Sequence, residues 1–464
     1  MIRVLLINPP WGRQKGNIWY KVASCLPSLG LGYIAATLEQ NKIQVKILDC
    51  QAVSYSIPEI VSEVKCFNPE YVGFTATTVL IQNAIEIAKV IKLHFPEIKI
   101  IFGGVHSTIM PEEVLMNPFV DIVVRGEGEL TFLDIIKNKP LKEILGISYK
   151  ANGHVNHNFD RPLIEDINCL PFPAYYLMPM DHYHTALGSA KRIPAMSIFA
   201  TRGCPGRCTF CYSGTLGKKI RQRSPENILD EIVLLMGKYK IREISFYDDT
   251  FTAFKNNVLK FCELIQKKNL DLTWSCMSRV DYASADVLKG MKASGCHQIC
   301  YGVESADENI LKNIKKRISL EKVKLAVELT KSAKIDVRLS FMLGNPGDTV
   351  ESLKKTIQYA IDLDPDLLQF NITTPYPGTE MFSWAKSNGY LKTEDWSNYD
   401  LYNCVMELPT ISSNDVEKYY RIAYRKFFLR PRYILKRLLK IRNLYDIKIA
   451  FKTCTSILMT TVGR

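Results

Sequence analysis

Short apolar runs alternate with amphipathic, helix-like segments along most of the chain, and this alternation restricts the possible folds more than any other feature. In the first 135 residues the apolar runs are Val4–Ile7, Val45–Leu48, Tyr71–Phe74, Ile98–Phe102 and Ile122–Val124. Most of them end in glycine, hydroxyl or acidic residues, at the edge where a parallel sheet binds its ligands. We therefore predict an α/β fold that begins with a flavodoxin- or Rossmann-like, doubly wound parallel sheet over residues 1–140.

The alternation resumes with a different spacing after residue 190. The candidate strands are Met196–Ala200, Glu243–Phe246, Leu272–Met277, Gln298–Gly302, Asp336–Met342 and Leu367–Thr373. Six strand–helix units favour a partial (β/α)6 TIM-like barrel over a full eightfold one. We place this barrel at residues 191–400, an ordered linker at 141–190, and a small, mainly helical region at 401–464.

Composition and cysteine usage indicate a reducing compartment. The chain has 464 residues, of which 47% are apolar and 23% charged, as in ordinary globular proteins. Its start, MIRVLLINPP, is typical of a strand and not of a signal peptide, and no run approaches 18 apolar residues. We expect a cytoplasmic protein. Thirteen cysteines then favour reduced thiols or a metal site, with Cys50, Cys66, Cys262 and Cys276 as small core residues.

The basic charge is concentrated at the C-terminus. Residues 421–464 contain twelve Lys and Arg and one acid, a net charge of +11 out of the chain's +13. On a helix, Ile434, Leu438, Ile441 and Tyr445 would form an apolar stripe beside a basic row. That row comprises Arg432, Lys436 and Lys440. The pattern suits peripheral contact with an anionic membrane, such as the inner membrane face, and equally a helix docked on the barrel. Charge confined to one helix is weak evidence for nucleic acid, and we expect none.

Three cysteines in the spacing C-x3-C-x2-C follow the first predicted barrel strand. Cys204, Cys208 and Cys211 have no fourth cysteine nearby, whereas structural zinc sites close with four ligands. Three thiolates on one loop suit a four-iron cluster with one iron left open for a small ligand. Cysteines with a purely structural role are the other reading of this spacing.

At these residues the sequence resembles the radical S-adenosylmethionine (SAM) superfamily, in which an aromatic residue, here Phe210, precedes the third cysteine. The resemblance covers residues 194–396. It implies that Cys204, Cys208 and Cys211 bind a [4Fe-4S] cluster, whose open iron holds SAM. Reductive cleavage of SAM then gives a 5′-deoxyadenosyl radical. An external one-electron reductant, such as flavodoxin or ferredoxin, is implied.

Later strand ends resemble the same family. Asp249 stands where the family contacts the methionyl amine, and Arg279 ends the third strand. Gly302 and Glu304 match the fourth-strand motif, with Glu304 toward the ribose or amino group of SAM. The run Gly344–Thr349 resembles a G-x-P-G-[ED]-T loop, with Asn345 and Asp348 as departures. Each match could also be a turn or a helix cap.

The first domain resembles the cobalamin-binding members of the superfamily. The residues expected at the cofactor are Thr75, Thr77, Gly103, Gly104, His106, Ser107, Glu127, Gly128 and Glu129. None of the seven histidines lies in a D-x-H-x-x-G motif, so the resemblance is to the subgroup that binds cobalamin without a histidine ligand. His106 fits a pocket or turn residue better than a metal ligand. A degenerate domain that binds nothing, or a nucleotide, is the alternative.

The resemblance implies an enzyme that methylates an unactivated carbon of a small-molecule or lipid-like substrate. A radical cyclase or rearrangement enzyme of the same family is the first alternative. An RNA methylthiotransferase is more remote, because Cys25, Cys50 and Cys66 lack cluster-like contexts and the tail reads helical. A cobalamin or redox sensor would need no SAM pocket. The sequence assigns no residue to hydrogen or methyl transfer.

Overall fold

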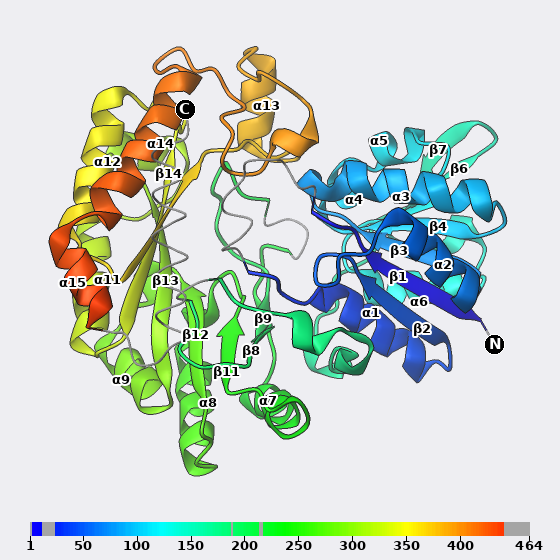
Figure 1. The fold of residues 1–464 in the computed structure, drawn as a ribbon, viewed down its shortest axis with the longest axis horizontal. Helices are drawn as coiled ribbons and strands as arrows, with labels where there is room; N and C mark the ends of the chain where they lie inside the picture. Colours follow the sequence, from blue (N-terminus) through cyan, green and yellow to red (C-terminus); the bar gives the residue numbers. More distant parts are fainter. Residues whose placement is uncertain (1, 12–23, 187–188, 213–216, 440–464) are drawn as a thin grey trace.

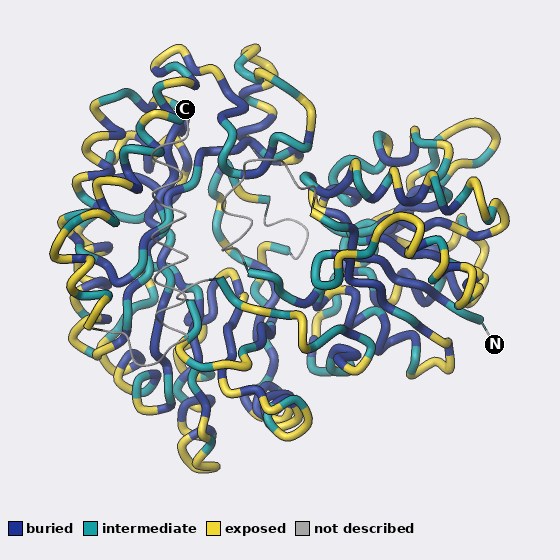
Figure 2. Tube along the Cα trace, in the orientation of Figure 1, coloured by how far each residue is buried: buried dark blue, intermediate teal, exposed yellow. Residues whose placement is uncertain are grey.

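Two mainly parallel sheets, each covered by helices, make up the computed structural model (Figure 1). The structure describes residues 2–11, 24–186, 189–212 and 217–439. Buried residues follow the strands of both sheets, and exposed residues follow the outer helices (Figure 2). The predicted fold class is confirmed.

The first sheet has seven strands in the order β2-β1-β3-β4-β5-β6-β7. Its strands are β1 (Arg3–Asn8), β2 (Gln44–Asp49), β3 (Tyr71–Thr75), β4 (Lys99–Gly103), β5 (Ile122–Val124), β6 (Ile147–Ala151) and β7 (His154–His157). β1 to β5 are parallel, whereas β6 and β7 add an antiparallel hairpin. The hairpin lies inside the expected linker. Its turn is Asn152-Gly153, where both residues have positive φ, as a tight two-residue hairpin requires.

Helices cover both faces of this sheet. They are α1 (Leu29–Gln40), α2 (Ile57–Phe67), α3 (Ile81–His94), α4 (Val105–Ile109), α5 (Pro111–Met116) and α6 (Gly128–Ile136). α1 and α6 contribute to one apolar core and α2 and α3 to another, so the sheet is doubly wound. The chain changes face between β1 and β3, where sheets of this kind bind ligands.

The second sheet has six parallel strands in the order β15-β14-β13-β12-β11-β8. They are β8 (Ala195–Ile198), β11 (Glu243–Phe246), β12 (Thr273–Ser278), β13 (Cys296–Glu304), β14 (Asp336–Leu343) and β15 (Leu367–Ile372). A short ribbon of β9 (Thr201–Arg202) and β10 (Arg221–Gln222) follows β8. The six strands match the predicted set, and they curl into a half-barrel (Figure 1).

Helices lie on the convex side of the half-barrel, leaving the concave side toward the first domain (Figure 1). They are α7 (Pro225–Tyr239), α8 (Lys255–Lys267), α9 (Ala285–Ala293), α10 (Glu308–Asn313), α11 (Leu320–Ser332) and α12 (Val350–Asp362). A further helix, α13 (Glu380–Ser387), lies on the side toward the first domain, where Phe382 joins an apolar core of that domain. Of the cysteines predicted to be core residues, Cys50, Cys262 and Cys276 are buried. The prediction for Cys66 is wrong: it lies in the last turn of α2 and is exposed.

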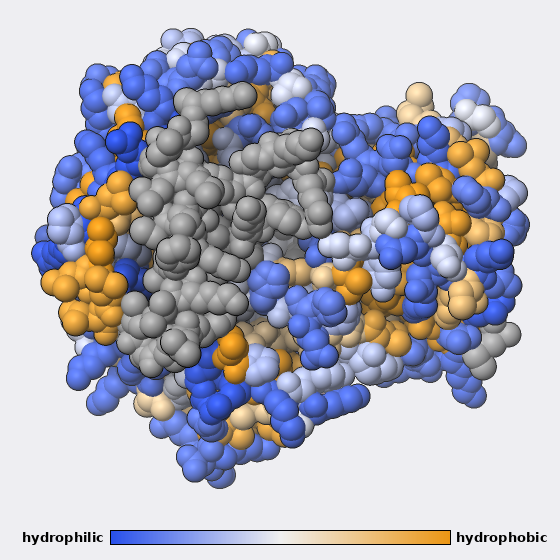
Figure 3. Space-filling view, in the orientation of Figure 1, coloured by the Kyte–Doolittle hydropathy of each residue, from blue (hydrophilic) through white to orange (hydrophobic). Residues whose placement is uncertain are grey.

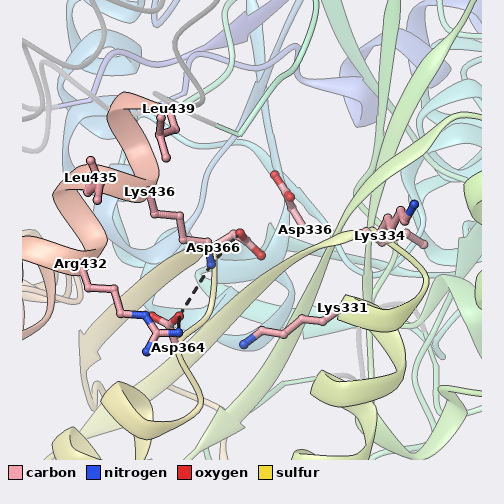
Figure 4. Close-up of a pocket in the computed structure, with 10 residues that line it drawn as sticks. Lys331, Lys334, Asp336, Asp364, Asp366, Arg432, Leu435, Lys436 and Leu439 are labelled. Carbon is pink, nitrogen blue, oxygen red and sulfur yellow. Dashed lines mark ion pairs between the residues drawn. The ribbon is translucent and has the colours of Figure 1, made fainter.

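The C-terminal region packs as α14 (Ser413–Phe428) and α15 (Pro431–Leu438). The hydroxyl of Tyr433 donates to the backbone oxygen of Asp366, just before β15. α15 therefore lies at the amino ends of the barrel strands, beside a pocket of about 630 Å³ (Figure 4). Acidic and basic side chains line this pocket in ion pairs, such as Lys436 with Asp366 at 3.0 Å.

The exposed side of α15 is apolar. Ile434, Leu435, Leu438 and Leu439 are all exposed, and apolar side chains gather over this helix in Figure 3. The other members of the predicted stripe and basic row, Lys440, Ile441 and Tyr445, lie outside the described residues. Among the helices of the described ranges, none is long and apolar enough to cross a membrane.

Candidate active site

The three cysteines lie on the loop that leaves the β8–β9 segment. Gly203 turns the chain with a φ of +97°, directly before Cys204. Cys204 and Cys208 are half-buried, and Cys211 is exposed. A Cβ atom on Gly206 would lie 3.3 Å from the Sγ of Cys204 and 3.9 Å from that of Cys208. The glycine therefore keeps the space between these two sulfur atoms open.

Two cations from later loops of the half-barrel, Arg279 after β12 and Lys316 after α10, lie close to the cysteine loop. Burial raises the pKa of the Cys208 thiol, and the charges of Lys316 and Arg279 partly oppose this rise. Burial raises the pKa of Cys211 to about 12, and the carboxylate of Asp249 adds to the effect. Metal binding at these thiols must therefore displace protons, and the two cations favour the thiolate form.

The donor chemistry of this loop fits a four-iron cluster. Three free thiols stand on one turn, with an open space at Gly206 and positive charge nearby. Within the described ranges, no three His, Cys, Asp or Glu side chains converge as a finished metal site does. The fit therefore rests on the chemistry and spacing of the donors.

Glu304 ends β13 in a bent backbone conformation. The register with β14 shifts between Gly302 and Glu304, and Glu304 has a φ of +74°. Its Oε1 accepts a 2.7 Å hydrogen bond from the Nζ of Lys316, and both side chains are buried. Such a bulge re-aims a side chain at the rim of a barrel, here toward the cysteine loop.

Gly302 makes room for this ion pair. A Cβ atom at this position would lie 2.5 Å from the Oε1 of Glu304 and 3.0 Å from the Nζ of Lys316. Only glycine therefore leaves the carboxylate and the ammonium group in their present positions. We missed Lys316 in the sequence because it belongs to no motif and lies 12 residues from its partner.

Replacing Gly302 by alanine is expected to displace the Glu304–Lys316 pair and weaken SAM binding about tenfold, the cost of one charge-assisted hydrogen bond. The dissociation constant of SAM, measured by equilibrium dialysis, checks this. Gly237→Ala is the matched control, because no atom lies within 4 Å of the added Cβ and the site is an exposed helix position. Equal SAM affinity in both variants would contradict the role given to Gly302.

The remaining predicted SAM-side residues lie around the same strand ends. The Nη2 of Arg279 pairs with the Oδ2 of Asp281 at 2.6 Å and donates to the backbone oxygen of Lys316. Asp249 is solvent-exposed as a residue, but partial desolvation of its carboxyl raises its pKa. Phe210 packs partly buried against the core. The structure thus brings Arg279, Asp249 and Glu304 together around the cysteine loop.

The cobalamin-side residues lie at the carboxyl edge of the first sheet. Thr75 and Gly103 end β3 and β4, and Thr77 is exposed just beyond. Gly104 has a φ of +92°, and a Cβ there would lie 2.8 Å from a backbone oxygen of the neighbouring loop. Ser107 is fully buried, and within the described residues its Oγ has no hydrogen-bond partner. An orphaned buried hydroxyl at this edge fits a polar ligand.

His106 is fully buried in the contact between the two domains. Its Nδ1 lies 3.3 Å from the Oγ1 of Thr78, and its Nε2 lies 3.7 Å from the Oε1 of Glu113. The ring of Trp396, which follows the half-barrel, stands edge-on at 5.5 Å and donates its Nε1 hydrogen to Glu113. Nδ1 thus has a hydrogen-bond partner, whereas Nε2 lies beyond hydrogen-bond distance of Glu113 and has no partner within the described residues. The ring is packed against Trp396.

Glu127 and Glu129 are joined to arginines of the second domain. Glu127 accepts from Arg202 and Arg221, each at 2.8 Å, and Glu129 accepts from Arg202 at 2.7 Å. All four side chains are buried. Burial raises the pKa of Glu127, but the hydrogen bonds from the arginines outweigh it, so the pKa is lowered. We call these four residues the arginine–glutamate cluster. It ties the β5–α6 loop to the segment before Cys204.

Asp248 holds the same segment from the other side. Its Oδ1 accepts hydrogen bonds from the backbone nitrogens of Ala200 and Thr201 and from the Thr201 hydroxyl. Arg202, which follows, belongs to the arginine–glutamate cluster. The chain entering the cysteine loop is therefore fixed by carboxylates from both domains.

The buried carboxyl of Asp248 is expected to make the stability of the folded protein depend on pH. Burial raises its pKa to about 7, and within the described residues its Oδ2 has no partner. The folded state then binds a proton that the unfolded state releases, so stability falls as pH rises from about 4 to about 7. The contribution is on the order of 4 kcal/mol over this range. The thermal unfolding midpoint, measured at several pH values, should change less with pH in Asp248→Asn than in the wild type. An equal change in both proteins would contradict this prediction.

Comparisons with known proteins agree with this geometry. The family model of the radical SAM superfamily matches residues 198–360, and that of the B12 binding domain matches residues 18–136. An uncharacterized methyltransferase of Pyrococcus horikoshii is 38% identical over 94% of this chain and 94% of its own. The anaerobic magnesium-protoporphyrin IX monomethyl ester cyclase of Rubrivivax gelatinosus is 26% identical over 93% of this chain and 78% of its own.

A solved structure shares the fold of both domains. The cobalamin-dependent SAM radical enzyme OxsB, with aqua-cobalamin and SAM bound, superposes with a TM-score of 0.75. The match covers 99% of this chain and 72% of that one, at 18% sequence identity. The cysteine loop, the order of the two domains and the 38% identical relative lead to one conclusion: the chain belongs to the cobalamin-binding branch of the radical SAM superfamily.

Proposed function

We propose that the protein is a cobalamin-dependent radical SAM methyltransferase that acts on an unactivated carbon of a small molecule. One observation carries this proposal. The arginine–glutamate cluster joins the β5–α6 loop of the cobalamin-type domain to the segment entering the cysteine loop. Two cofactors held at these loops would face a shared space, as transfer of a group between them requires.

The half-barrel would hold the cluster and SAM. Cys204, Cys208 and Cys211 would ligate the cluster. Bound together, the cluster and SAM supply a 5′-deoxyadenosyl radical, and cobalamin supplies a transferable methyl group. Glu304 uses only Oε1 for Lys316, so its Oε2 can accept a hydrogen bond from SAM. Asp249, Arg279, Gly302 and Phe210 complete the proposed SAM site.

The first domain would hold cobalamin at the carboxyl ends of β3 to β5. Thr75, Thr77, Gly103, Gly104 and Ser107 are the proposed contacts, with the buried Ser107 hydroxyl as the best supported. The carboxylates of Glu127 and Glu129 already accept from arginines, so we assign them to fixing their loop and leave the contact to the backbone at Gly128. His106 is packed with its Nε2 side toward Glu113 and its ring against Trp396, which supports cobalamin binding without a histidine ligand.

A radical cyclase is the second candidate. The similarity over 93% of the chain to a protein named as a cyclase favours it. The two reactions differ in products, because methyl transfer consumes a second SAM and releases S-adenosylhomocysteine, whereas cyclisation does not.

The deciding experiment uses anaerobically purified, iron-reconstituted protein with hydroxocobalamin, SAM and a strong reductant. Visible spectra report bound corrinoid, and mass spectrometry reports 5′-deoxyadenosine and S-adenosylhomocysteine. Bound corrinoid with both products supports methyl transfer. Bound corrinoid with 5′-deoxyadenosine alone favours the cyclase. Absence of bound corrinoid would overturn the assignment of the first domain.

An external one-electron reductant, such as flavodoxin or ferredoxin, completes the proposed reaction. The exposed Cys211 offers it an approach to the cluster loop. The cysteines of the described ranges are all free thiols, which supports a reducing compartment, the cytoplasm.

Peripheral membrane contact through α15 is a finer proposal. Its exposed apolar residues and the basic tail support it. α15 lies at the amino ends of the barrel strands, opposite the cysteine loop, so such contact would anchor the protein without presenting the site to lipid. Cosedimentation with phosphatidylserine vesicles tests it, and loss of binding in Leu435→Glu is the expected result.

A further inference from the structure

The inner surface of the half-barrel carries a row of polar side chains on β14 and β15. Alternate residues of a strand point to opposite faces of its sheet. Leu339, Phe341 and Phe370 are fully buried on the convex, helix-covered side. Their neighbours along the strands are only half-buried: Arg338, Ser340, Gln369 and Asn371. These polar residues therefore line the concave side, where substrate would lie.

A continuous series of hydrogen bonds joins these four side chains. The Nη2 of Arg338 donates to the Oε1 of Gln369 at 2.6 Å. Gln369 donates through Nε2 to the Oδ1 of Asn371 at 2.9 Å, and Asn371 donates to the Oγ of Ser340 at 3.4 Å. Each amide group is thus oriented by its hydrogen-bond partner, and the hydrogen-bonded series fixes the position of the Arg338 guanidinium group.

The hydrogen-bond partner of Arg338 differs from those of the buried arginines at the domain interface. Arg202 and Arg221 face carboxylates, whereas Arg338 faces a neutral amide. A guanidinium has five N–H donors, and only the bond to Gln369 engages Arg338 within the described residues. A half-buried guanidinium with most donors unused matches the planar fork that binds carboxylate or phosphate.

Arg338 is positioned to bind a group of the substrate at some distance from the proposed SAM site. Arg338 pairs in register with Cys300 on β13, four residues before Glu304. Four residues of a strand span about 13 Å, so an anion at Arg338 would lie about one small molecule's length from the proposed SAM site. Burial raises the pKa of Tyr247, which follows β11, and the charge of Arg338 partly opposes this rise, so the phenol lies near the guanidinium group.

We propose that Arg338 binds an anionic group of the substrate, a phosphate or a carboxylate, and so selects an acidic small molecule over a neutral lipid. The inference rests on the proposed function, because it takes the concave face as the substrate site. The carboxylate of SAM is a second anion that Arg338 could bind, and the test below distinguishes it from an anionic group of the substrate.

The test titrates inorganic phosphate into cluster- and cobalamin-reconstituted protein and follows its 31P NMR line width without reductant. We expect phosphate binding to weaken about tenfold in Arg338→Gln and to be unchanged by saturating SAM. Arg242→Gln is the matched control, an exposed arginine paired with Asp271 at the amino end of β11. Arg338→Lys keeps the charge without the fork, should be intermediate, and serves if the glutamine variant does not assemble.

Equal phosphate affinity in the wild type and Arg338→Gln would overturn the proposal, as would a wild type that binds no phosphate. Full displacement of phosphate by SAM would assign Arg338 to the SAM carboxylate and also overturn it. No SAM turnover enters this measurement. Absence of 5′-deoxyadenosine formation would therefore count against the proposed function alone and leave the phosphate result standing.

Discussion

Cys208→Ala is expected to lose the iron–sulfur cluster and, with it, all SAM-derived 5′-deoxyadenosine. A four-iron cluster with one iron open for SAM has only three protein ligands, so removing one leaves too few thiolates to hold it. Iron content, the visible absorbance of the cluster and 5′-deoxyadenosine by mass spectrometry are the measurements, and we expect each to fall to background after anaerobic reconstitution.

Cys169→Ala is the control for this variant. Cys169 is another accessible free thiol, and it lies in the segment between the two sheets. Its replacement should leave iron content and SAM cleavage at wild-type levels. A Cys208→Ala protein that keeps its cluster, or a Cys169→Ala protein that loses it, would mean that the assigned cysteine triplet is wrong.

Arg202→Ala is expected to destabilise the protein by about 3–5 kcal/mol, because it leaves the carboxylates of Glu127 and Glu129 buried beside too little positive charge. Arg202 also lies over the ring of Tyr33 at 5.0 Å, so packing is lost as well. For a domain of this size the thermal unfolding midpoint should fall by roughly 10 °C. Differential scanning calorimetry of the reconstituted protein measures it.

The matched control for Arg202→Ala breaks an exposed ion pair. Lys255 and Asp286 pair at 2.6 Å with both side chains 55% exposed. Lys255→Ala should cost less than about 1 kcal/mol, since water screens such pairs. A second variant, Glu129→Gln, keeps a hydrogen-bond acceptor for Arg202 and should fall between the two. If Arg202→Ala and Lys255→Ala shift the midpoint equally, the buried cluster does not hold the domains together.

The strands of both sheets could be predicted because each is a local pattern. The run at 243–246 was predicted at its observed bounds, and the other barrel strands within two residues. The β6–β7 hairpin escaped prediction as part of the sheet. Its strands, ISYKA and HVNH, lack the uninterrupted apolar run of the other strands, and the Asn152-Gly153 turn between them is the one local signal of a hairpin. They are strands because the edge of β5 offers hydrogen bonds, which depends on tertiary structure.

The same division holds for the candidate site. Cys204, Cys208 and Cys211 carry their signal in their spacing, and Gly302 and Glu304 lie at the end of one strand. The arginine–glutamate cluster carried no such signal. Glu127 was expected at a cofactor, but its partners Arg202 and Arg221 lie 75 and 94 residues away. Nothing in local sequence says which distant cation meets a buried carboxylate.

The sequence by itself determined the two α/β domains, their order, and the loop that carries the cysteines, because hydrophobic periodicity and metal-ligand spacing are properties of neighbouring residues. Only the tertiary structure decided that Lys316 pairs with Glu304, that His106 packs against Trp396, and that Arg338 faces the concave side without a carboxylate. Those contacts depend on how strands and loops far apart in the chain meet, and burial makes charges at such meetings costly to leave unpaired.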